Sequence, residues 1–82
     1  MSVTPNDVLQ GLAEVLAEVS GVAADKVVRE ATFDNDLEVD SLTMVEVVVA
    51  CEERFEVRIP DEALEGLRTV GDAVDFIAGA AK

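Results

Sequence analysis

Apolar residues recur at intervals of three and four along three segments of the chain, and this spacing constrains the fold more than any other feature. Residues at these intervals share one face of an α-helix, because each helical turn takes about 3.6 residues. A chain of 82 residues has room for one small domain with a modest core. The spacing therefore predicts an all-α fold in which three helices each turn an apolar face inward.

The first helix is expected over residues 5–20. Thr4 suits its N-cap, Pro5 its first helical position and Asp7 its third. Gly21 suits the left-handed residue that commonly ends a helix. The apolar face of this helix comprises six residues: Val8, Leu9, Leu12, Val15, Leu16 and Val19.

Residues 22–40 show no sustained helical period, which predicts a long loop between the first and second helices. Long ordered loops in small domains are often functional. Large apolar residues in such a loop are more often buried than used for binding. Four of them are expected to anchor the loop to the core: Val27, Val28, Phe33 and Leu37.

A second helix is expected over residues 41–55, although its run of valines would also suit a strand. Its apolar residues follow helical spacing and do not alternate. The core face comprises Met44, Val47, Val48, Cys51 and Phe55. We expect Cys51 to pack as a small hydrophobe and not to act as a reactive thiol, because no basic neighbour adjoins it on the helix.

The residue pattern in the last third of the chain predicts two further helices. Residues 57–60 form an extended link, and Asp61 is expected to cap a brief helix that runs to about Leu67. Thr69 and Asp72 have the spacing of a second helix start. The final helix has an apolar face of Val70, Ala73, Val74, Ile77 and Ala81, with Phe76 beside it and partly exposed. The expected fold is a small four-helix bundle with three longer helices, one short third helix and a long loop between the first two.

The net charge of −12, from 18 acidic and 6 basic residues, excludes several classes of partner. Nucleic acids and anionic membrane surfaces both require a basic patch. The apolar runs are too short to span a bilayer, and the first residues lack the pattern of a secretory signal. One cysteine forms no internal disulfide, which is typical of a cytoplasmic protein. We therefore expect a cytoplasmic monomer that binds no nucleic acid and has no stable membrane association.

The chain has no histidine, which removes the commonest general base and the usual zinc patterns. Cys51 accordingly has no histidine with which to form a catalytic pair. We expect a protein that is not an enzyme and holds no metal. An acidic binding or carrier module fits this composition.

A second apolar strip lies on the helix expected over residues 41–55, about 140° away from its core face. It consists of Leu42, Val45 and Val49, with carboxylates around it at Glu46, Glu52, Glu53 and Glu56. Residues 34–65 hold eleven acidic and two basic residues, a net charge of −9 out of −12. Two interpretations stay open. Either the short helix or the loop covers the strip, or basic partners dock on it.

Ser41 lies between Asp40 and Leu42 at the start of the second helix. Asp40 and Ser41 could simply cap this helix. A nucleophilic serine needs a nearby base, and no histidine is present. A phosphate ester on the Ser41 hydroxyl would instead face the free N–H groups and the positive dipole end of the helix.

Five segments form a specific pattern along the chain: FDNDLEVDSL (33–42), VE (45–46), EERF (52–55), IPDE (59–62) and TVGD (69–72). In this order they resemble the acyl carrier proteins, most closely the discrete carriers of dissociated (type II) fatty acid synthase. The triplet DSL alone is weak, but its position before the other segments is specific. The resemblance covers essentially the whole chain and implies a single acyl carrier domain, residues 1–82.

The resemblance implies that Ser41 is esterified by 4′-phosphopantetheine, which a carrier protein synthase transfers from coenzyme A. The thiol of this arm would hold growing acyl chains as thioesters. The partners implied are that synthase, malonyl transferase, ketosynthases, reductases and a dehydratase. The implied partner-binding surface comprises Asp40, Leu42, Val45, Glu46, Val49, Glu52 and Glu53. The strip found from periodicity lies within this surface.

Three alternatives to a fatty acid carrier stay open. The first is a carrier of another pathway, which would share the same fold. That pathway could be type II polyketide synthesis, another specialised acyl pathway or peptide synthesis on a peptidyl carrier. Alternate acidic residues over 34–40 imitate an EF-hand calcium loop, but Val39 and Val45 stand where that loop needs glycine and glutamate. A plain acidic interaction domain would leave Ser41 unmodified.

Overall fold

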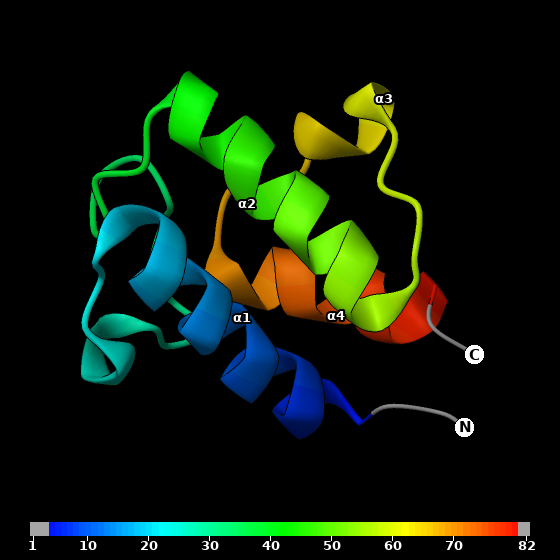
Figure 1. Cartoon of the computed structure of the whole chain (residues 1–82), viewed down its shortest axis with the longest axis horizontal. Helices are drawn as coiled ribbons and strands as arrows, with labels where there is room; N and C mark the ends of the chain where they lie inside the picture. Colours follow the sequence, from blue (N-terminus) through cyan, green and yellow to red (C-terminus); the bar gives the residue numbers. More distant parts are fainter. Residues whose placement is uncertain (1–3, 81–82) are drawn as a thin grey trace.

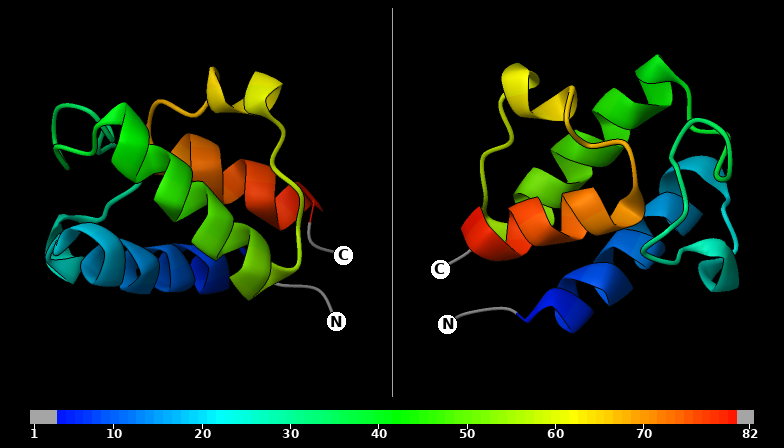
Figure 2. Two further views of the ribbon diagram at one scale, coloured as in Figure 1. Left: turned by 45° about the horizontal axis from the view of Figure 1, so that its top comes forward. Right: turned by 180° about the vertical axis from the view of Figure 1, so that it is seen from behind.

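The structure, a computed structural model, describes residues 4–80. Its elements are α1 (Pro5–Ser20), the short 3₁₀-helix η1 (Ala24–Lys26), α2 (Ser41–Phe55), α3 (Asp61–Leu64) and α4 (Val70–Ala80) (Figure 1). The three longer helices enclose the core, and α3 lies beside α2. The loop between α1 and α2 closes the end of the bundle opposite the two termini (Figure 2). The expected all-α four-helix bundle is confirmed.

The starts of α1 and α4 are held by the same hydrogen-bonded motif. The Thr4 hydroxyl accepts a hydrogen bond from the Asp7 N–H at 3.1 Å, and the Asp7 carboxylate accepts one from the Thr4 N–H at 3.4 Å. Thr69 and Asp72 repeat the two bonds at 3.1 and 3.2 Å. Each motif satisfies two N–H groups that a helix start leaves without partners. Both helix starts expected from the sequence are confirmed.

The end of α1 is also the expected one. Gly21 adopts a left-handed conformation with φ at 71°, which glycine accepts at little cost. Its N–H donates to the Ala17 carbonyl at 3.1 Å, and the Val22 N–H reaches back to the Leu16 carbonyl at 3.3 Å. These two bonds close the last helical turn and direct the chain into the loop.

The loop of residues 22–40 packs on the core through Val27, Phe33 and Leu37, which are buried as expected. The expectation that Val28 also anchors the loop is wrong, because its side chain is 46% exposed. The backbone leaves η1 in a partly extended conformation at Val27, so the next side chain points the opposite way.

The middle of the loop is fixed against the start of α4. The Phe33 N–H of the loop donates to the Arg68 carbonyl at 3.1 Å. In the other direction, the Val70 N–H donates to the Ala31 carbonyl and the Gly71 N–H donates to the Arg29 carbonyl, both at 2.9 Å. A Cβ at Gly71 would lie 3.1 Å from the Arg29 carbonyl oxygen, so glycine permits this close approach. The loop is therefore part of the packed structure.

α3 differs from the expectation at both ends. Asp61 is its first residue and not its cap, since Pro60 takes the N-cap position without a side-chain hydrogen bond. The helix ends at Leu64 and not near Leu67, because Leu67 turns inward and is buried. The Leu67 N–H still donates to the Leu64 carbonyl at 3.1 Å, so a tight turn replaces the expected last helical turn.

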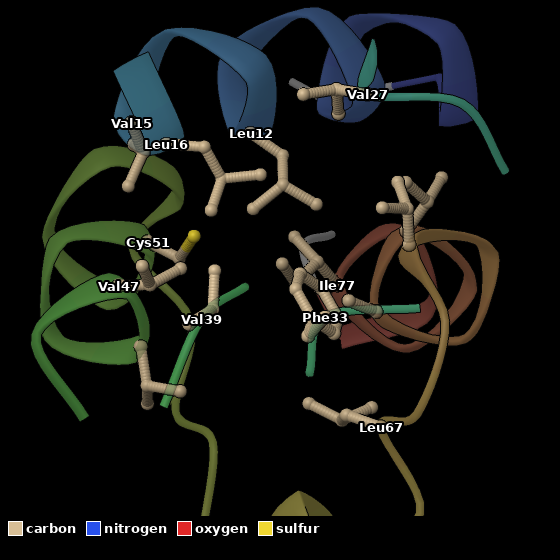
Figure 3. Packing of buried hydrophobic residues seen from close by; sticks show 14 of the residues in the cluster. Leu12, Val15, Leu16, Val27, Phe33, Val39, Val47, Cys51, Leu67 and Ile77 are labelled. Atoms are coloured by element: carbon tan, nitrogen blue, oxygen red, sulfur yellow. The ribbon is translucent and has the colours of Figure 1, made fainter. Parts of the chain in front are cut away.

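Side chains from the three longer helices and the loop meet in one apolar core. Figure 3 shows Leu12 and Leu16 on one side, Val47 and Cys51 on another and Ile77 on a third, all directed toward one another. The expected helix faces are confirmed, with Leu9, Val19, Met44 and Phe55 only partly buried at their margins. Phe76 is partly buried as well, and Ala81 lies outside the described residues.

Candidate functional site

The first turn of α2 leaves the Ser41 hydroxyl available. Asp40 occupies the N-cap, and its carboxylate accepts a hydrogen bond from the Thr43 N–H at 2.8 Å. This bond holds the pKa of Asp40 below its usual range, so the residue is charged at neutral pH. Because Asp40 supplies the cap, Ser41 is not needed for it and stands exposed as the first helical residue.

The loop before Ser41 is held in a tight turn. The Thr32 carbonyl accepts hydrogen bonds from two N–H groups of the turn, including that of Leu37 at 3.1 Å. The Val39 N–H donates to the Phe33 carbonyl at 2.7 Å, and Glu38 adopts a left-handed conformation with φ at 53°. Since Phe33, Leu37 and Val39 are all buried, the position of Ser41 is tied to the core.

A cleft of about 930 Å³ opens beside Ser41. Three segments form its walls: the loop, the first turns of α2, and the stretch from α3 to α4. The lining residues are Thr32, Phe33, Asp34, Asn35, Val39, Asp40, Ser41, Met44, Val45, Leu64, Glu65, Leu67 and Arg68. The sequence pattern indicated the serine but not the cleft or Arg68, because the walls come from segments far apart in the chain.

This geometry fits a phosphate ester that carries a flexible chain. Ser41 provides an exposed hydroxyl, and the N-terminal end of α2 favours a negative charge there. The neighbouring cleft has room for the rest of such a group along the protein surface. The exposed hydroxyl, the helix N-terminus and the cleft together suit the attachment of phosphopantetheine.

The second apolar strip of α2 is exposed. Leu42, Val45 and Val49 have 73%, 51% and 47% of their surface accessible. α3 does not cover the strip, and a groove of about 450 Å³ separates it from α2, with Val45 and Val49 in the groove wall. The interpretation in which a neighbouring element buries the strip is therefore wrong. Glu46 and Glu53 stand exposed on the same helix.

Glu52 differs from the other carboxylates of α2. It is only partly exposed, and its carboxylate accepts a hydrogen bond from the Ile59 N–H at 2.8 Å. The chain reaches Ile59 after Glu56 ends α2 in a left-handed conformation with φ at 53°. Glu52 thus fixes the link between α2 and α3, a role that its place in the sequence pattern did not indicate.

The whole chain compares closely with known carriers. Residues 10–77 match a protein family described as the phosphopantetheine attachment site. An acyl carrier protein of Acidothermus cellulolyticus is 55% identical over 80 residues, which cover 98% of this chain and 95% of the relative. The chain belongs to the acyl carrier protein family. It is therefore a carrier, and the expected cofactor, 4′-phosphopantetheine, is confirmed as that of the family.

Two further comparisons agree with this assignment. A protein of Mycobacterium tuberculosis named meromycolate extension acyl carrier protein is 47% identical over 77 residues, which cover 94% of this chain and 67% of that relative. A solved acyl carrier protein from Enterococcus faecalis superposes with a TM-score of 0.78 at 35% identity, covering 95% of this chain and 99% of that one. The arrangement of helices is thus that of a solved acyl carrier protein.

Two acidic residues of the loop, Asp34 and Asp36, stabilise its turns. The Asp36 carboxylate accepts hydrogen bonds from the Thr32 N–H at 2.8 Å and from the Thr32 hydroxyl at 3.2 Å. Asp34 accepts one from the Asn35 N–H at 2.9 Å. Over residues 4–80, no three acidic or cysteine side chains converge as metal ligands would. The calcium-loop alternative therefore gains no support from the geometry.

Cys51 is packed in the core of this carrier. Its side chain is 2% exposed, and burial raises the pKa of the thiol to about 12. The expectation that no basic residue adjoins Cys51 on the helix is wrong, because Arg54 lies three residues on and lowers the thiol pKa, but burial outweighs this charge. The thiol therefore stays protonated at neutral pH, which agrees with the expectation that Cys51 packs as a small hydrophobe and is not a reactive thiol.

None of the helices within residues 4–80 combines the length and apolar character that a bilayer crossing would need.

Proposed function

We propose that Ser41 is the residue that carries 4′-phosphopantetheine, and that residues 1–82 act as a single acyl carrier domain. The observation that carries this proposal is the exposed Ser41 hydroxyl at the start of α2, beside a cleft that can receive the arm. A carrier protein synthase would use coenzyme A as donor. The serine oxygen would form a bond to the phosphorus that carries the pantetheine and would give up its proton to a base of the synthase. The P–O–P bond between the two phosphates of coenzyme A would break, and the adenosine bisphosphate half of the donor would leave.

When an acyl group is loaded, the thiol of the arm would hold it as the reactive thioester. The protein's own residues would position the arm. Asp40 fixes the first turn of α2 through its bond to the Thr43 N–H, so the Ser41 oxygen has a defined direction. The buried Phe33 and Leu37 hold the loop that precedes it. A rigid attachment point with a long flexible arm suits delivery of one acyl group to many enzymes.

We propose that partner enzymes bind the outer surface of α2. Exposed Leu42, Val45 and Val49 supply apolar contact, and charged neighbours attract basic partners. The surface comprises Asp40, Leu42, Val45, Glu46, Val49, Glu52 and Glu53. Contacts with the synthase, malonyl transferase, ketosynthases, reductases and dehydratase would each be small and short-lived, which suits a carrier that must leave after each step. Glu52 would contribute chiefly by shaping the surface, because its carboxylate holds Ile59.

The pathway that we propose is type II fatty acid biosynthesis. Relatives at 47–48% identity are named as carriers for meromycolate extension, which supports a role in extending acyl chains. A purified set of type II fatty acid enzymes should extend acyl groups on this carrier. Acceptance only by polyketide ketosynthases would overturn the pathway and leave the attachment at Ser41 intact.

Attachment is tested by incubating the protein with coenzyme A and a carrier protein synthase. The intact mass should rise by one phosphopantetheine in the wild type and stay unchanged in Ser41→Ala. Ser20→Ala is the matched control, since the Ser20 hydroxyl only donates to the Leu16 carbonyl at 3.0 Å, and it should load normally. A wild type that stays unmodified where a reference carrier is loaded would refute the assignment.

The docking surface is tested with Val45→Asp and Glu46→Lys. Each should weaken binding to a ketosynthase by about tenfold, equivalent to about 1.4 kcal/mol, because one removes apolar contact and the other reverses charge. Surface plasmon resonance or titration calorimetry measures this. Glu18→Lys makes the same charge change on exposed α1 and should leave the affinity within about twofold. Equal losses at Glu18 and Glu46 would mean that only net charge matters.

A further inference from the structure

The cleft beside Ser41 is an unfavourable place for a phosphate in one respect. Three carboxylates line it, those of Asp34, Asp40 and Glu65. The charged Asp40 also accepts the hydrogen bond of the Thr43 N–H at the start of α2, so this donor is not free for a second anion. A phosphodiester on Ser41 would therefore lie among like charges, and a nearby cation would lower its free energy.

Arg68 is the one basic residue in the wall of this cleft. Within residues 4–80 the ion pairs are those of Arg29 with Asp75 and of Arg54 with Glu14, at 2.9 and 2.7 Å. Arg58 and Arg68 thus have no carboxylate partner in the described part of the chain. Arg68 is exposed, and the arginine side chains that donate hydrogen bonds within residues 4–80 are those of Arg29 and Arg54.

The backbone of Arg68 is nevertheless held in place. Its carbonyl accepts a hydrogen bond from the Phe33 N–H at 3.1 Å, which joins it to the loop that precedes Ser41. Its neighbour Leu67 is buried, and Thr69 caps α4. The Arg68 side chain therefore extends from a fixed point of the backbone in the wall of the cleft that Ser41 also lines.

We propose that Arg68 binds the phosphodiester of the arm attached to Ser41 and so holds the first part of the arm in the cleft. This proposal rests on the proposed function of Ser41. Arginine suits the task, because its planar guanidinium donates two parallel hydrogen bonds to phosphate oxygens and stays charged at all physiological pH values. Arg68 is a positioning residue and takes no part in the chemistry at the thioester.

Arg58 provides a matched control. It too has no carboxylate partner in the described residues, but it lines the groove between α2 and α3, whose wall does not include Ser41. Arg58→Gln and Arg68→Gln make the same change in net charge. Any difference between them then reports on position and not on the overall field of the protein.

The test is phosphorus NMR of the loaded protein. Wild type, Arg58→Gln and Arg68→Gln are loaded with the synthase, and intact mass confirms one arm on each. The phosphodiester resonance should shift in Arg68→Gln, while Arg58→Gln should match the wild type. Added salt should move the wild-type resonance toward that of Arg68→Gln, since the contact is electrostatic. Arg68→Lys keeps the charge and should give an intermediate position.

Two results would overturn the proposal, and they are distinguishable. Identical resonances in all loaded proteins, or equal shifts in both glutamine variants, would remove the role of Arg68 and leave the attachment at Ser41 intact. A wild type that does not load would refute the attachment itself. Circular dichroism of the unloaded variants checks their folding, and Arg68→Lys tests the contact even if the glutamine variant is unstable.

Discussion

Valines lie on both faces of α2, and their surroundings differ sharply. Val47 is 1% exposed and belongs to the apolar core, whereas Val45, two residues earlier, is 51% exposed. The two residues are of the same type and lie in the same helix, so the difference in exposure comes from their angular positions around the helix axis. One helix therefore stabilises the fold with one face and offers the other to partners, and single substitutions can address each function separately.

The largest effect should come from Val47→Ala. Removing two buried methyl groups leaves a cavity and should lower the free energy of unfolding by about 2 kcal/mol. The melting temperature would fall by roughly 10 °C in a domain of this size. Val45→Ala is the control, and it should change the unfolding free energy by less than about 0.5 kcal/mol, as expected of a surface substitution. Equal losses in urea titrations would show that the faces are not distinct.

A smaller effect should separate Glu52 from Glu53. Glu52→Ala leaves the Ile59 N–H without its acceptor and should cost about 1–2 kcal/mol of unfolding free energy. Glu53→Ala removes an exposed carboxylate and should be close to neutral in stability. Chemical denaturation of the two variants makes the comparison. A stable Glu52→Ala protein would place Glu52 wholly with the partner-facing carboxylates.

The smallest effect is a pH dependence at Cys51 on the core face. The thiol has a pKa of about 12 in the folded chain, above its ordinary value of 9.0, so it remains protonated there while the unfolded chain ionises. The protonated thiol's contribution to the free energy of unfolding is fully present below pH 9 and is lost as the pH rises toward 12. Between pH 8 and pH 10 the wild type should lose about 1 kcal/mol more than Cys51→Val. Parallel losses in the two proteins would contradict this burial effect.

The sequence predicted those parts of the fold that depend on neighbouring residues. The cap of α1 needs only Thr4 and Asp7, three residues apart, and the cap of α4 repeats it. The two faces of α2 follow from helical spacing in the same way. These features could be predicted because no distant segment decides them.

Features that depend on distant segments could not be predicted. Val28 looked like an anchor, but the direction of its side chain depends on how the loop leaves η1. The bond from Ile59 to Glu52 requires the chain to turn back at the end of α2. The site was predicted at Ser41, but the cleft and the place of Arg68 in its wall depend on two stretches that are distant in the sequence: the loop with the start of α2, and the stretch from α3 to α4.

The small size of α3 affects how the protein opens. None of its four residues is fully buried, so separating it from the bundle exposes little apolar surface. Its backbone amides should exchange with deuterium well before those of α1, α2 and α4. Leu64, at its end, lines both the cleft beside Ser41 and the groove along α2. A local opening of this one turn would therefore enlarge both spaces at once, without unfolding the three helices that carry the core.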